Sequence, residues 1–389
     1  MKPRPSLWRR LVALLFGTAL ALVLAELIAT WAFGGAYPYV NLFVADPALG
    51  VRLQPEAETT VRSPLGRDTD IATNGLGFRG PTFAGPPEKR VLVLGDSQVM
   101  AYGVPEELGF PSRLAARGFD VLAAGIPTWG PDEYVALADE LVTRFEPAVV
   151  VLVLNAANDL HEAGHPNRLR TTARDGWAVG LTPGLELDPP TDFPGRHFLL
   201  SRSHLVLAIR LLLHGDPHER EIPPALAMVA FANAAPRPSP PWRSPLGPAL
   251  SAIAKTCLIK RCRLVTAFLP ADVAVDAREW AKYEAFLPAD SKGRPPGLGP
   301  VLALHHAARI DEAVLSERTA RLRQEPRDPS RPPPPTWLDL GPALAGPGTF
   351  LPDDFHLSAD GHAAVADALA SALPTWLALP RPPAFAETP

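Results

Sequence analysis

A serine follows the first predicted strand of the domain. Gly95-Asp96-Ser97 comes directly after the apolar run Val91–Leu94, and open α/β sheets bind ligands beyond the carboxyl ends of their strands. Serine is a weak nucleophile that needs a neighbouring base, and a helix N-terminus expected behind Ser97 would stabilise negative charge there. An isolated Gly-Asp-Ser is also common as an ordinary turn or helix cap. The chemistry therefore depends on a base elsewhere in the chain.

A candidate base lies near the C-terminus, in the segment Asp353-Asp354-Phe355-His356. Asp353 and His356 are three residues apart on a predicted turn. This spacing lets the carboxylate hold one imidazole nitrogen while the other faces a serine hydroxyl. Taken alone, the pair is also compatible with a capping aspartate beside a surface histidine. Together with Ser97 it supplies the three groups of a catalytic triad.

Two further strand ends offer hydrogen-bond donors for the oxyanion that develops during acyl transfer. Gly125 follows the apolar run Val121–Ala124, and a glycine lets its backbone N–H approach a ligand closely. Asn158 follows the run Val149–Leu154, and its side-chain amide can donate a hydrogen bond. Glycine and asparagine are also common turn residues, so each assignment gains its weight from the others.

In this chain order the motifs resemble those of the SGNH/GDSL hydrolase family, especially its bacterial branch with an N-terminal anchor and a segment like Gly77-Phe78-Arg79-Gly80. The resemblance covers roughly residues 73–373, apart from an insert. It implies a flavodoxin-like three-layer αβα fold around a central parallel sheet, and ester chemistry on acyl groups. The roles it implies are Ser97 as nucleophile and backbone oxyanion donor, Gly125 and Asn158 as the other donors, His356 as base, and Asp353 as its orienting partner.

Two residues depart from the family pattern. Gln98 follows the serine where the family often has an apolar residue, and Ala157 stands where a glycine often precedes the asparagine. Neither change removes a catalytic group, but both bear on the shape of the substrate pocket.

The elements that must position these residues alternate between strands and helices. Besides the three runs above, Leu264–Leu269 and Trp337–Leu340 read as buried strands. Apolar residues at helical spacing from Tyr134 to Phe145 predict one helix, and Ser358 or Asp360 can cap another near the C-terminus. This alternation predicts an α/β fold with a parallel sheet.

The N-terminus predicts a membrane anchor. Lys and Arg residues precede the run Leu11–Ala32, whose single charge is Glu26, and a run of that length can cross a hydrocarbon core of about 30 Å. The alternatives are a cleaved secretory signal and a buried core helix. Because the basic residues come first, the N-terminus should stay in the cytoplasm, with the catalytic domain outside it, periplasmic or extracellular.

The expected plan of the chain is a cytoplasmic N-terminus at 1–10, a transmembrane anchor at 11–33, a neck at 34–89, a hydrolase domain at 90–380 with a Pro-rich insert at about 160–247, and a tail at 381–389. Within the insert, the run Phe198–Leu213 is apolar enough for a helix. It could pack on the domain, or form a lid or membrane-leaning cap over the site.

Three other features need an interpretation. His161-Glu162-Ala163-Gly164-His165 matches the H-E-x-x-H zinc motif, but Gly164 and the following proline weaken the helix that this motif requires. Cys257 and Cys262 are compatible with a disulfide in an exported protein or with two buried thiols. A net charge of −4 without a basic stripe gives little support for nucleic-acid binding.

The residues therefore favour a serine-dependent enzyme that needs no cofactor and hydrolyses or transfers ester-linked acyl groups. Its position suggests O-acetyl groups of envelope polysaccharide or lipid-linked sugars as substrate. The alternatives are a zinc metallohydrolase that uses His161 and His165, or a noncatalytic envelope-binding protein that keeps the fold.

Overall fold

Five strands of the described chain form a parallel sheet in the order β11-β10-β7-β5-β6. Their bounds are β5 Arg90–Gly95, β6 Asp120–Gly125, β7 Val149–Asn155, β10 Arg263–Leu269 and β11 Trp337–Asp339. Nearly every side chain of β5, β6, β7 and β10 is buried, as expected of strands covered on both faces. Counted along the chain, this is the order 2-1-3-4-5 of flavodoxin-like sheets. The predicted fold class is confirmed.

The computed structural model describes residues 6–62, 67–180, 200–214, 246–284, 337–352 and 355–382. Asp353 and much of the predicted insert lie outside these residues.

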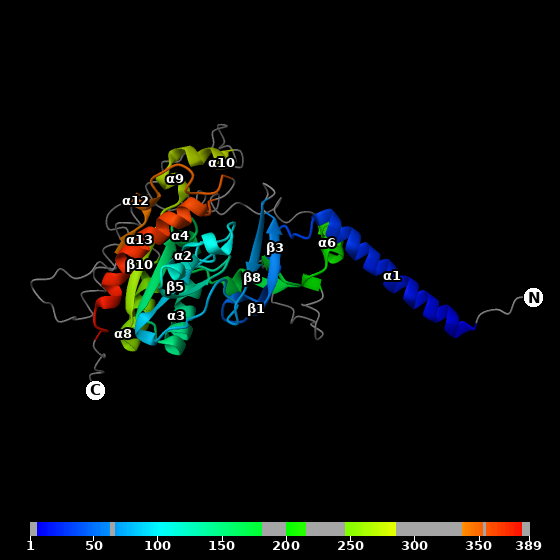
Figure 1. Ribbon diagram of the computed structural model, residues 1–389, viewed down its shortest axis with the longest axis horizontal. Coiled ribbons are helices and arrows are strands. Elements are labelled where there is room, and N and C mark those ends of the chain that lie inside the picture. The colour runs from blue at the N-terminus through cyan, green and yellow to red at the C-terminus, as the bar shows by residue number, and fades with distance from the viewer. Residues whose placement is uncertain are drawn as a thin grey trace, which may run out of the picture.

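Helices cover both faces of the sheet, which gives three layers (Figure 1). α3 (Pro131–Phe145) and α8 (Gly247–Lys260) pack together over one face, and α2 (Phe110–Ala116), α12 (Gly341–Leu344) and α13 (Ala359–Ala378) cover the other. Successive strand side chains point to opposite faces. Leu92 and Leu94 therefore join the core under α3 and α8, while Val91 and Val93 join the core under α2 and α13.

Pairs of short antiparallel strands form a separate layer, which lies between the parallel sheet and the N-terminal helix (Figure 1). They pair as β1 (Phe43–Asp46) with β2 (Gly50–Leu53), β3 (Glu58–Arg62) with β4 (Asp68–Ala72), and β8 (Thr171–Arg174) with β9 (Trp177–Gly180). An antiparallel bridge between Phe43 and Gly176 joins the first pair to the third. The start of the predicted insert thus packs on the neck.

The N-terminal helix α1 (Leu7–Phe33) has 27 residues and is long and apolar enough to cross a membrane. Most of its large apolar side chains are exposed, so it is not a core helix of the described chain. It projects away from the sheet, and α6 (His204–His214) lies beside its end (Figure 1). The remaining helical segments are η1 Pro87–Lys89, η2 Glu106–Leu108, α4 Asp159–Glu162, η3 Asn167–Leu169, α9 Asp272–Val275, η5 Ala277–Trp280 and α10 Ala281–Glu284.

The structure corrects one expectation. The chain behind Ser97 is a run of turns, and the next α-helix, α2, begins only at Phe110. Cys257 and Cys262 are buried free thiols in the structure, which is one of the two alternatives that the sequence left open. Cys257 is the last buried residue of α8. The Cys262 N–H donates to the Cys257 carbonyl at 2.9 Å, where the chain turns from α8 into β10. Both side chains fill the apolar core under α3 and α8.

Candidate active site

The centre of the site is a contact between Ser97 and His356. The Ser97 Oγ lies 2.7 Å from the His356 Nε2, although the two residues are 259 positions apart in the chain. Both side chains are only 7% exposed. At this distance an imidazole can accept the proton of a serine hydroxyl, which is the geometry that nucleophilic catalysis by serine needs.

The turn that carries Ser97 is fixed by Asp96. One carboxylate oxygen of Asp96 accepts the Gln98 N–H at 2.9 Å, and the other accepts the Asn155 side-chain amide at 2.9 Å. The carbonyl of Ser97 accepts the Tyr102 N–H at 3.0 Å. These bonds tie the end of β5 to the end of β7, so the serine is held by buried polar contacts without a helix behind it.

Gln98 joins the nucleophile turn to the loop of the base. Its side-chain amide donates to the Phe355 carbonyl at 3.2 Å and accepts the Leu357 N–H at 3.0 Å. The two bonded backbone groups flank His356, so Gln98 clamps the histidine from both sides. Gln98 is buried, so the residue that departs from the family pattern helps to hold the loop that carries His356.

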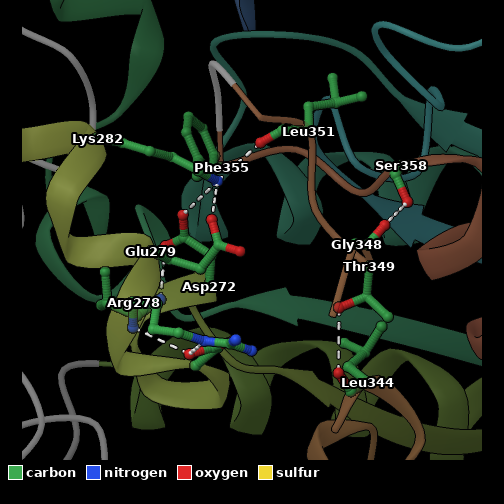
Figure 2. Close-up of polar contacts among 12 residues, drawn as sticks. Asp272, Arg278, Glu279, Lys282, Leu344, Gly348, Thr349, Leu351, Phe355 and Ser358 are labelled. Atoms are coloured by element: carbon green, nitrogen blue, oxygen red, sulfur yellow. Dashed lines mark hydrogen bonds and ion pairs between the residues drawn. The ribbon is translucent and has the colours of Figure 1, made fainter. Parts of the chain in front are cut away.

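The loop before His356 is braced from two directions. The Leu351 N–H donates to the His356 carbonyl at 2.8 Å. From α10, the Lys282 ammonium donates to the Leu351 carbonyl at 2.7 Å and pairs with the Asp272 carboxylate at 3.3 Å (Figure 2). On the other side of the loop, the Thr349 hydroxyl donates to the Leu344 carbonyl at 3.1 Å (Figure 2).

The last predicted helix begins directly after this loop. Ser358 caps α13, because its hydroxyl accepts the N–H groups of Asp360 and Gly361, each at 3.2 Å. The imidazole of His356 lies between two rings, with centroid distances of 4.4 Å to Phe355 and 5.0 Å to Tyr102. The cap and the rings limit the positions that the imidazole can take.

Asn158 lies at the N-terminus of α4 and is 7% exposed. Its side-chain N–H donates to Glu162 at 3.2 Å, and its side-chain oxygen is buried without a hydrogen-bond partner in the described structure. Glu162 also pairs with Arg170 at 3.2 Å. Burial raises the pKa of Glu162 to about 8, and Arg170 opposes that rise. Glu162 thus orients the amide that sequence reasoning placed in the oxyanion hole.

Gly125 ends β6 beside Gly95 of β5. A Cβ on Gly125 would lie 2.5 Å from the Asp96 carbonyl oxygen and 2.7 Å from the Val99 side chain. Only glycine lets this strand end come so close to the nucleophile turn.

Asp159 follows Asn158 but faces the interior. Its carboxylate accepts the Tyr134 hydroxyl at 2.9 Å and the Asn155 N–H at 2.7 Å. Burial, with the nearby Asp96 charge, raises the pKa of Asp159 well above its usual range. Asp159 therefore fixes the end of β7 and supports the segment that carries Asn158.

The H-E-x-x-H segment does not form one helix. α4 ends at Glu162, Gly164 has a left-handed φ of 79°, and His165 is exposed. The motif holds zinc when a helix places both imidazoles on one face, and that spacing is lost here. The residue of the motif that reaches the site is Glu162, through its bond with Asn158.

Of the residues predicted from sequence, the structure brings Ser97 and His356 into contact and leaves Asp353 outside its described part. Sequence reasoning missed the roles of Gln98, Asn155 and Glu162. Their polar type within otherwise apolar surroundings was the available signal, since buried polar side chains need partners.

No protein-family model and no curated protein matches the sequence. Solved structures do match. A lipolytic protein of the G-D-S-L family from Desulfitobacterium hafniense aligns over 73% of this chain and 99% of its own, at 11% identity and a TM-score of 0.36. A psychrotrophic esterase from Pseudoalteromonas sp. aligns over 74% and 98%, at 13% identity and 0.34. A GDSL-like lipase from Bacteroides thetaiotaomicron aligns over 75% and 88%, at 12% identity and 0.31.

The raised pKa of Glu162 predicts a pH-dependent stability. An acid whose pKa rises on folding holds its proton more tightly in the folded chain, so stability falls as pH rises from about 4.5 to about 8. Glu162→Gln cannot ionise and should remove this loss, shifting the melting temperature relative to wild type by on the order of 5 °C across that window. Melting curves at several pH values measure the shift. The control is Glu88→Gln, at an exposed carboxylate, and parallel wild-type and Glu162→Gln curves would contradict the prediction.

The clamp on His356 predicts a kinetic effect of Gln98→Leu, which puts an apolar residue after the serine. Two neutral hydrogen bonds are lost, each worth about 1 kcal/mol, and a tenfold rate change corresponds to about 1.4 kcal/mol. We expect a fluorophosphonate to react with Ser97 about tenfold more slowly, because the base is less well held. The melting temperature is measured in parallel, and an unchanged labelling rate in a folded Gln98→Leu chain would refute the role of the clamp.

Proposed function

We propose that this chain is a serine esterase of the SGNH/GDSL type, acting on ester-linked acyl groups. The observation that carries the proposal is the 2.7 Å contact between the Ser97 Oγ and the His356 Nε2. The imidazole removes the proton of the hydroxyl while the Oγ attacks the ester carbonyl carbon. The imidazolium then returns that proton to the departing alkoxide, and an acyl-enzyme remains on Ser97.

The other proposed roles are those that the resemblance in sequence implies. The backbone N–H groups of Ser97 and Gly125 and the side-chain amide of Asn158 are the proposed oxyanion donors. Asp353 is the proposed partner of the His356 Nδ1. Because Nε2 accepts from the serine hydroxyl, Nδ1 must carry the hydrogen in the resting state, and a carboxylate acceptor would hold that tautomer.

Ser97→Ala or His356→Ala should lower turnover of a short-chain chromogenic ester by several orders of magnitude, since only binding and the oxyanion donors remain. Fluorophosphonate labelling should be lost in Ser97→Ala. The matched control is Ser251→Ala, which removes a hydroxyl bonded to the Gly247 carbonyl on α8 and should keep full activity. Undiminished turnover in a folded Ser97→Ala chain would refute the nucleophile.

The length and apolar character of α1 support its role as a retained membrane anchor. Basic residues precede it, which favours a cytoplasmic N-terminus and a catalytic domain outside the cytoplasm. The enzyme would then meet envelope polysaccharides and lipid-linked sugars at the outer face of the membrane.

That location leads us to propose O-acetyl groups of an envelope glycan as the substrate. The acyl-enzyme can be resolved by water or by a sugar hydroxyl, so the same site supports hydrolysis or transfer. Exclusion of water and positioning of the acceptor decide between them.

The acetate content of purified envelope polysaccharide separates these outcomes. Cells that carry Ser97→Ala should retain more acetate than wild type if the enzyme removes it, and less if the enzyme transfers it. Cells with Ser251→Ala should match wild type. No change in any envelope fraction, with good turnover of long-chain lipid esters in vitro, would replace the glycan with a lipid substrate.

A further inference from the structure

A carboxylate of the N-terminal helix holds the start of a second apolar helix. Glu26 of α1 accepts the Ser203 hydroxyl at 2.6 Å, the His204 N–H at 2.7 Å and the Leu205 N–H at 3.1 Å. These groups form the N-terminus of α6, where negative charge is favourable and free N–H groups need acceptors. The single charge within the apolar run of α1 is thus bound by α6.

One face of α6 packs against aromatic rings of the chain, and another face is exposed. The His204 ring stacks on Tyr37 at 4.3 Å, and the Arg210 guanidinium lies 3.6 Å over the Trp177 ring. Away from these contacts, Ile209, Leu212 and Leu213 are 46%, 86% and 71% exposed. Their spacing of three and four residues places them on one face of the helix.

The depth of Glu26 in the membrane determines whether the exposed face of α6 contacts lipid. If the hydrocarbon begins near Leu11, after the basic residues, Glu26 lies about 23 Å further along the helix at 1.5 Å per residue. The hydrocarbon core is about 30 Å thick, so Glu26 falls inside it, on the side of the catalytic domain. A carboxylate at this depth is costly unless it is paired. Its bonds to α6 supply that pairing and place the start of α6 at the same depth.

We propose that α6 lies in the membrane leaflet nearer the catalytic domain, docked on α1 through Glu26, with Ile209, Leu212 and Leu213 against lipid acyl chains. The inference rests on the anchor role proposed for α1. With 11 residues, α6 is about 17 Å long and too short to span the bilayer, so it is an interfacial segment. Two helices in the membrane would fix how the catalytic domain is oriented over the lipid surface.

The test places an environment-sensitive dye on single introduced cysteines of the full-length chain in phosphatidylcholine vesicles. Leu212→Cys reports α6, Leu20→Cys reports α1, and Glu88→Cys reports an exposed site on the catalytic domain. The unsubstituted chain, whose thiols are buried, is the labelling blank. Doxyl-phosphatidylcholine should quench the dye at Leu212→Cys and Leu20→Cys at least twofold, and iodide should quench it only at Glu88→Cys.

The outcomes distinguish a failure of the α6 placement from a failure of the proposed anchor or of the proposed esterase activity. Lipid quenching at Leu20→Cys but iodide quenching at Leu212→Cys would overturn the placement of α6 and leave the anchor standing. Protection of Leu212→Cys from both quenchers would overturn it by showing that protein covers the face. Iodide quenching at Leu20→Cys would refute the anchor and α6 together, whereas ester turnover, measured on the same vesicles, tests the enzyme independently.

A separate variant tests whether Glu26 holds α6 against α1. In a Glu26→Leu, Leu212→Cys chain we expect lipid quenching of the dye to fall by at least half, while the Leu20→Cys dye is unaffected. Unchanged quenching at Leu212→Cys would overturn the role of Glu26 in holding α6.

Discussion

The hydrogen bond between Ser97 and His356 constrains much of this structure, because it joins residues 259 positions apart. A bond of 2.7 Å tolerates little relative movement of its two loops. Each loop is therefore fixed separately, the serine turn by Asp96 and Asn155 and the histidine loop by Lys282 and by the cap of α13. Gln98 then joins the two loops directly. The parallel sheet provides the frame, since β5 and α13 pack in the same core.

A second constraint is steric. The ends of β5 and β6 meet as Gly95 and Gly125 in register, and a side chain on either would collide with the nucleophile turn or its Val99. The polar groups of the site can converge because these two positions carry no side chain. Elsewhere in the site, burial raises the pKa values of the Asp159 and Glu162 carboxyl groups.

The strands were predictable because fully buried parallel strands are continuous apolar runs, and β5, β6, β7 and β10 are such runs. The contact between Ser97 and His356 was predictable because Ser97 follows a buried strand and His356 precedes the last helix, each within a recognisable motif. The helix expected behind Ser97 was wrong, since tertiary bonds to Asp96 fix that turn instead. Gln98 could not be assigned from sequence because its partners, the backbone groups beside His356, lie 257 and 259 positions away. Glu162 was missed for another reason: it stands in an apparent zinc motif, yet the helix ends at that residue and its side chain accepts from Asn158 four positions earlier.

The layer next to α1 is assembled from segments that are far apart in the chain. β1 is joined to Gly176, the Asn41 side chain donates to the Ser201 carbonyl, and Glu26 receives the start of α6. Three strands of the catalytic sheet, β5, β6 and β7, lie between these partners in sequence. During synthesis, the N-terminal segment must therefore wait for residues near 200, while the sheet can begin to form first. Until then the edge of β1 is unpaired, and exposed edges are where chains pair wrongly. Closure of this layer is a late, long-range step that should limit how fast the chain reaches its final form.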